Sequence, residues 1–152
     1  MSKLEKLLDE FESFIPNWEV VNTAVSAASV GWHIEHSFLV LNKVMDGLAK
    51  SNPEEYKNSF NIMKTIVFTT GVIPRGKAKA PKAVIPAGDF TKESLETLFA
   101  STKNRIGGFN HFQKRNFIVH PYFGKLHLKD TQTMLRIHTK HHLKIIKDIL
   151  KG

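Results

Sequence analysis

The chain has 152 residues, the size of one ordinary domain, and we predict a single domain over residues 1–152. It has no cysteine, which excludes disulfides and thiolate metal sites, so any metal must sit on imidazole or oxygen ligands. The formal net charge of +8 is compatible with nucleic-acid binding, but no recognition motif accompanies the small basic cluster at Lys77, Lys79 and Lys82, so we do not expect a nucleic-acid partner.

No apolar run approaches the roughly 18–20 residues that are needed to span a bilayer. The N-terminal segment MSKLEKLLDEFESF is amphipathic and acidic, whereas a secretory signal is basic and then apolar. We therefore expect no membrane partner and a cytoplasmic location.

The first predicted helix spans Ser2 to Ile15. Its apolar residues recur at spacings of three and four, and Ser2 with Glu5 matches the capping-box pattern that begins helices. Pro16 ends the helix, because a proline disfavours helical geometry in the residue before it. The exposed apolar residues of this helix would offer an interface for a homodimer.

The second predicted helix is longer and runs from about residue 23 to residue 49. One stripe follows it at spacings of three and four and contains Val21, Val25, Ala28, Trp32, His36 and Leu39. The sequence Lys50-Ser51-Asn52-Pro53 breaks this helix. Residues 54–69 are helical in composition, although their β-branched end is ambiguous.

Residues 71–88 are predicted to form a long loop, because they contain Pro74, Pro81, Pro86 and three glycines. A loop of this length in a compact domain either covers a pocket or connects two parallel helices of a bundle. We favour the connection.

The last third of the chain contains two further predicted helices. Thr91 is an N-cap for a helix that ends near residue 107, and the last helix spans residues 128–150. Residues 110–126 between them are irregular, with a turn at residues 120–124.

Strand signals are scarce, apart from a weak pattern at residues 83–85. The predicted fold is therefore all-α, and the amphipathic helices fit a four-helix bundle with long crossover connections.

Two histidines occupy core positions of the last helix. The apolar stripe of that helix is Leu135, His138, His142, Ile145 and Ile149, with spacings of three and four. An i, i+4 histidine pair can direct both imidazoles at one ion. Side by side in an apolar core, two imidazoles need polar partners, and one metal ion satisfies both.

His36 is the predicted third ligand, because it lies on the stripe of the second helix and core positions of different helices face each other in a bundle. His33 and His141 fall on the flanks of their stripes, so we do not include them. The alternative is that the three core histidines bond to the backbone, or to one another through water.

The remaining histidines give weaker signals. His111 and His127 lie in or near loops, and we expect them to be exposed. His120 precedes Pro121 in the turn before the last helix, where it could line the mouth of the site or hold the turn.

Several stretches resemble one family. The C-terminal HPYFGKLHLKDTQTMLRIHTKHHLKII resembles the end of DinB-like (damage-inducible) proteins, in particular a branch of unknown function with an HPxFGKL turn followed by HxxHHL. The stretch SVGWHIEHS resembles the family's second helix, in which a serine precedes the ligand histidine by seven positions, as Ser29 precedes His36. The loop around Pro74-Arg75-Gly76 also resembles this branch.

The resemblance implies a DinB-like four-helix bundle with long crossovers and a three-histidine site, with one ligand from the second helix and two from the last. By position these ligands are His36, His138 and His142. The chain departs from the family pattern at two places near the ligands. Residues 132–134 lack the usual aromatic residue, and Ile145 stands where the family often has a glutamine.

Three neutral histidines leave at least one open position on a divalent ion, which suits a bound water or thiol. Relatives in the wider family include hydrolases and thiol-dependent transferases, so we expect metal-dependent hydrolysis or thiol transfer with a small-molecule or thiol substrate. Zinc or nickel is preferred over iron or manganese. Glu35 points a helical step away from the site and is no compelling base. The alternative is a non-catalytic stress-response or binding module with a structural metal or none.

Overall fold

The computed structural model describes residues 3–152, so the predicted capping residue Ser2 lies outside the described part of the chain. The elements within it are four long helices, one short helix and one hairpin. In chain order they are α1 (Lys3–Phe14), α2 (Val30–Lys50), α3 (Ile62–Thr70), α4 (Lys92–Ile106), β1 (Phe117–His120), β2 (Gly124–His127) and α5 (Leu128–Leu150). Short 3-10 helices lie at Ile15–Asn17, Pro53–Glu55, Lys82–Val84 and Gly107–His111.

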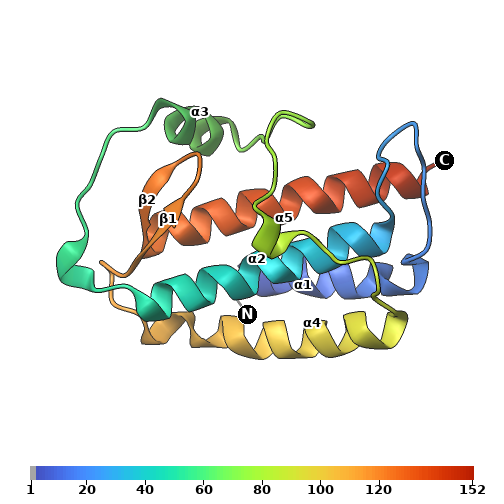
Figure 1. The fold of residues 1–152 in the computed structure, drawn as a ribbon, viewed down its shortest axis with the longest axis horizontal. Helices are drawn as coiled ribbons and strands as arrows, with labels where there is room; N and C mark the ends of the chain where they lie inside the picture. Colours follow the sequence, from blue (N-terminus) through green and yellow to red (C-terminus); the bar gives the residue numbers. More distant parts are fainter. Residues whose placement is uncertain (1–2) are drawn as a thin grey trace.

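The four long helices form a bundle, in which α1 and α2 each pack against both α4 and α5. Figure 1 shows that α1 and α5 run in one direction while α2 and α4 run in the other. The predicted mainly helical fold is thus confirmed. The order of directions also makes α2 and α4 parallel, which requires the chain to cross the length of the bundle between them.

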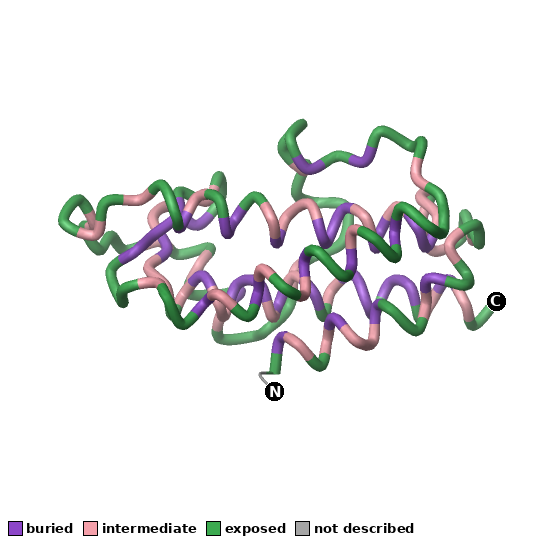
Figure 2. Tube along the Cα trace, turned by 90° about the horizontal axis from the view of Figure 1, so that it is seen from below, coloured by how far each residue is buried: buried purple, intermediate pink, exposed green. Residues whose placement is uncertain are grey.

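Buried apolar side chains line the facing sides of the long helices, and the connecting segments are largely exposed (Figure 2). On α1 the buried residues are Leu4, Leu8 and Phe11, and Leu7 and Phe14 are half-buried against the same core. The apolar residues of α1 that were expected to be exposed thus pack inside the bundle, while a homodimer itself stays a prediction.

A small antiparallel hairpin corrects the all-α prediction. Strand β1 pairs with β2 in a register that places Phe117 opposite His127 and His120 opposite Gly124. Each strand has four residues, which is too short for alternation to stand out in the sequence. Gly124 takes the positive φ of 70° that the tight turn requires. The weak strand signal at residues 83–85 is instead part of a 3-10 turn.

Helix α2 begins at Val30, seven residues after the predicted start. Its N-cap is Ser29, whose hydroxyl accepts the backbone N–H of Trp32. Residues 18–29 are a loop that folds back on the start of the helix, where the Val30 N–H donates to the Val20 carbonyl. Val21 and Val25 lie in this loop, so they do not belong to the helical stripe.

The third predicted helix is also shorter than expected. Residues 54–69 contain a 3-10 turn and an irregular stretch before α3 starts at Ile62, capped by the Asn61 side chain on the Lys64 N–H. Gly71, with a φ of 67°, ends it. Asn61 therefore supplied an N-cap signal inside the segment that was predicted as continuous helix.

The crossover segment, residues 71–91, connects α3 to the start of α4 and passes α5 and α2 on the way (Figure 1). Arg75 pairs with Asp148 of α5 at 2.7 Å, and the Tyr122 hydroxyl bonds both the N–H and the carbonyl of Lys79. This segment is the last part of the chain between the parallel helices α2 and α4, so the predicted connection of parallel helices is confirmed. The Val84 carbonyl of this segment also bonds His36, one of the predicted ligands, so the segment covers part of that ring as well.

No helix within residues 3–152 is both long enough and apolar enough to cross a membrane.

Asn116 joins the end of α2 to the hairpin. Its side-chain amide donates to the Ser51 hydroxyl at 2.9 Å and to the Leu48 carbonyl, while its side-chain oxygen accepts the Gln113 N–H. We expect Asn116→Ala to lower the free energy of unfolding by about 2 kcal/mol, because it removes the hydrogen bonds by which a buried side chain joins Leu48 and Ser51 to Gln113. The matched substitution at the exposed Asn110 should change it by less than about 0.5 kcal/mol in chemical denaturation. Equal losses in the two variants would contradict this role.

Candidate metal centre

Three histidines from two helices meet where α2 packs against α5. His36 comes from α2 and His138 and His142 from α5, and one ligand nitrogen of each lies within 4.8 Å of the other two. His36 and His142 are buried, with 4% and 7% of their surface exposed, and His138 is half-buried. The three histidines predicted from helical spacing are thus brought together and could hold one metal ion.

The spacing of the nitrogens suits a small ion. The centre of a triangle with 4.8 Å sides lies about 2.8 Å from each corner, so bonds of roughly 2.1 Å to zinc require each nitrogen to move by less than about 1 Å. Rotation of an imidazole about its side-chain torsions covers such a distance. Within residues 3–152 the cluster consists of histidines and contains no carboxylate.

The orientation of His36 is fixed by the crossover segment. Its Nδ1–H donates to the Val84 carbonyl at 2.7 Å, because a carbonyl oxygen can only accept. The lone pair therefore lies on Nε2, the nitrogen left for a metal. The Trp32 ring stacks on the imidazole, with 5.0 Å between ring centroids and an interplanar angle of 13°. Hydrogen bonding of the second nitrogen to a carbonyl is the usual support of a metal-ligating histidine.

His33 is a member of the cluster that the sequence analysis missed. It is buried, with 4% of its surface exposed, and its Nδ1 lies 3.0 Å from Nδ1 of His142. Its Nε2 lies 3.0 Å from the Ser26 hydroxyl. His33 was placed on the flank of the α2 stripe because Val21 and Val25 were counted in that stripe. The buried residues of the real helix include Val30, His33, Ser37, Leu41, Val44 and Leu48.

Burial keeps these imidazoles neutral. It is the main cause that lowers the pKa of His33 to about 4 and the pKa of His36 below its ordinary value. The pKa values of His138 and His142 lie well below 6.5, first because of burial and then because neighbouring histidines repel a second positive charge. Neutral imidazole is the form that binds metal ions, so the site is prepared for a cation at neutral pH.

His141 and His120 lie beside the cluster. His141 is half-buried, and its pKa is lowered by burial and by the Arg75 charge. His120 holds the hairpin turn: its Nδ1 accepts the backbone N–H groups of Tyr122 and Phe123, and its ring stacks on Phe123 with centroids 4.3 Å apart. Of the two roles considered for His120, the turn-holding one is therefore confirmed.

The two remaining histidines differ in exposure. His111 is exposed, as expected. His127 is half-buried, because its Nδ1 caps α5 by accepting the Asp130 N–H and its ring stacks on Tyr56. The expectation that His127 is exposed is therefore wrong.

Glu35 lies outside the cluster, as its place on the helix predicted. It is half-buried, and its Oε2 atom has no hydrogen-bond partner. Burial raises the pKa of this carboxyl, and the Asp89 charge adds to the effect. Its neighbouring charge is thus another acid and not an imidazole of the cluster.

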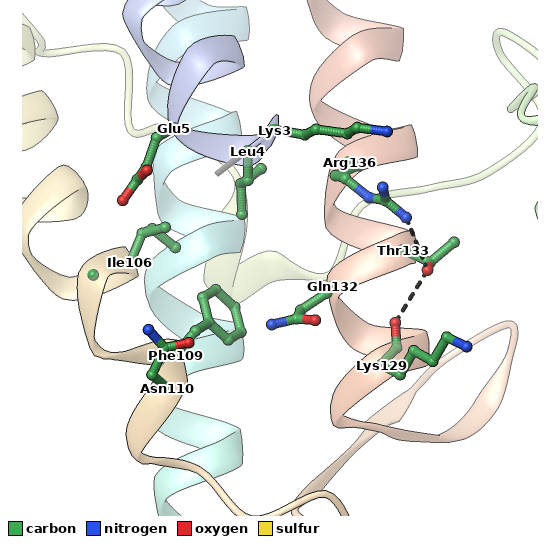
Figure 3. A pocket seen from close by; sticks show the side chains of 11 residues that line it. Lys3, Leu4, Glu5, Ile106, Phe109, Asn110, Lys129, Gln132, Thr133 and Arg136 are labelled. Atoms are coloured by element: carbon green, nitrogen blue, oxygen red, sulfur yellow. Dashed lines mark hydrogen bonds between the residues drawn. The ribbon is translucent and has the colours of Figure 1, made fainter. Parts of the chain in front are cut away.

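A surface pocket of about 380 Å³ lies between the starts of α1 and α5 (Figure 3). Leu4, Ile106 and Phe109 are among the residues that line it, and Gln132 points into it. None of its lining residues belongs to the histidine cluster, so it is a separate feature of the surface.

No protein-family model matches the chain, and no curated protein or solved structure is significantly similar to it. The resemblance to DinB-like proteins therefore stays a prediction from the quoted motifs.

The lowered pKa of His120 predicts a loss of folding stability at acid pH. Burial lowers its pKa to about 4 from 6.5, so the folded state binds fewer protons than the unfolded state, and stability is lost as the pH falls from 6.5 towards 4. In His120→Asn, the side-chain oxygen can replace Nδ1 as the acceptor but cannot titrate. Between pH 7 and pH 4, we expect the metal-free wild type to lose up to about 3 kcal/mol more unfolding free energy than this variant. Parallel pH profiles of urea unfolding would contradict the assignment.

Proposed function

We propose that this chain is a DinB-like protein that binds one divalent transition-metal ion on His36, His138 and His142 and catalyses a metal-assisted hydrolysis or thiol transfer. The observation that carries the proposal is the meeting of three ligand nitrogens within 4.8 Å at the contact of α2 with α5. The oriented Nε2 of His36 and the neutral state of all three rings support it.

The donor set favours zinc or nickel. Imidazole nitrogens suit zinc, nickel, copper and iron, whereas magnesium and calcium prefer oxygen ligands, which the cluster lacks. Zinc is the first ion to test, because it is commonly bound by three histidines and one exchangeable ligand. Nickel is second, and iron and manganese are alternatives.

An ion held by three neutral imidazoles supplies a Lewis acid that lowers the pKa of a bound water or thiol. The chain's own residues provide the surroundings. Val84 and Pro86 of the crossover segment are buried, and the Val84 carbonyl accepts the Nδ1–H of His36, so the segment covers that edge of the ring. Residues 71–88 contain four basic and no acidic residues, so an anionic substrate would be attracted to this edge.

One observation favours a second candidate, a structural metal in a non-catalytic protein. His36 and His142 are almost fully buried, and the crossover segment is tied to His36. Structural sites are closed, whereas catalytic sites keep an open position. The two candidates share the ligands and differ in whether a small molecule can reach the ion.

Metal binding itself is tested by measuring the metal content of the purified protein. We expect untagged wild type to retain about one zinc or nickel ion per chain, and His138→Ala to lose it because two imidazoles hold the ion far less tightly. His111→Ala, at an exposed histidine, should keep the metal content of the wild type. Elemental analysis by mass spectrometry gives the stoichiometry. Wild type without stoichiometric metal, or His138→Ala with as much as wild type, would refute the site.

Access to the ion separates the two candidates. We expect azide or a small thiol to change the visible spectrum of the cobalt-loaded protein, because an open position accepts an added ligand. At a zinc concentration 100 times the dissociation constant, the folded state should gain about 2.7 kcal/mol under either candidate. A cobalt spectrum that saturating azide and thiol leave unchanged would favour the structural alternative.

A further inference from the structure

We propose that His33 is a positioning residue that stabilises the metal-binding tautomer of His142 by accepting its Nδ1–H, in a hydrogen-bond chain that ends on Ser26. This inference rests on the proposed metal binding and assigns a role to a residue outside the three ligands.

The chain is continuous and mostly buried. Nδ1 of His142 lies 3.0 Å from Nδ1 of His33, and Nε2 of His33 lies 3.0 Å from the hydroxyl of Ser26. The Ser26 oxygen also accepts the backbone N–H of Ala28 at 3.1 Å, which holds the loop before α2 in place. His33 is thus fixed at both ring nitrogens.

Two proton arrangements are compatible with these contacts. In the first, His142 donates from Nδ1 to His33, and His33 donates from Nε2 to Ser26. In the second, Ser26 donates to His33, His33 donates from Nδ1 to His142, and the remaining proton of His142 sits on Nε2. Each neutral ring carries one N–H in both arrangements.

Only the first arrangement permits metal binding by His142. Its Nδ1 is occupied by His33, so a metal must use Nε2, and Nε2 has a free lone pair only when the proton is on Nδ1. His36 differs, because its partner is the Val84 carbonyl, which accepts and never donates. The imidazole of His33 can do either, so the direction of the whole chain is coupled to the ion.

The acceptor role of His33 is tested with an isosteric pair. In His33→Asn, the side-chain oxygen can stand near the position of Nδ1 and accept from His142. His33→Leu has a similar volume and no acceptor. We expect the zinc dissociation constant, measured by competition with a chromophoric chelator, to rise 10- to 100-fold in the leucine variant. The asparagine variant should recover at least half of that loss on a logarithmic scale.

The wild type gives a second measurement that needs no variant. Nitrogen-15 spectra of the histidine side chains distinguish the two tautomers, and we expect zinc-loaded protein to show His33 protonated on Nε2 and His142 protonated on Nδ1. A His33 ring protonated on Nδ1 would overturn the inference, as would a leucine variant that binds zinc as tightly as wild type. A wild type that binds no metal would refute the proposed function together with this inference. A wild type that binds zinc while the leucine variant binds it equally well would refute only the role of His33.

Discussion

The contact between α2 and α5 buries imidazole rings that would be costly to charge. His33, His36 and His142 lie at this contact with less than a tenth of their surface exposed, and His138 lies beside them half-buried. A core at this place built from aliphatic side chains would need no hydrogen bonds. Here the rings demand partners, and the Val84 carbonyl, the Ser26 hydroxyl and the rings themselves supply them. The loop before α2 and the crossover segment are both tied to the bundle at this point.

Helical spacing was sufficient to predict the three proposed ligands. His138 and His142 fall on one side of α5 because their separation of four residues is close to one turn, and the real helix covers both. His36 does lie in the cluster, although the stripe used to select it began too early. His33 was missed for the same reason, since a stripe restricted to residues after the Ser29 cap places it with Val30 and Ser37.

Other parts of the structure depend on contacts that a single segment does not encode. The hairpin forms where Asn116 and Ser51 join its first strand to the end of α2, residues 65 positions apart. The irregular stretch before α3 is stabilised by pairs such as Asn61 with the Tyr122 carbonyl, again from a distant part of the chain. Local propensity cannot show such partners, whereas the caps at Ser29, Asn61 and Thr91 are readable in the sequence.

The hydrogen bond from His36 to Val84 has a thermodynamic consequence. It connects a ring that faces the proposed ion to the crossover segment, so order in that segment and metal affinity at the ring are thermodynamically linked. An ion that holds His36 in place reduces the conformational freedom of residues 71–91. When this segment is already docked, metal binding costs it less conformational entropy, so Nε2 of His36 binds the ion more tightly. Hydrogen exchange in the crossover segment would then report the occupancy of a site to which it contributes no ligand.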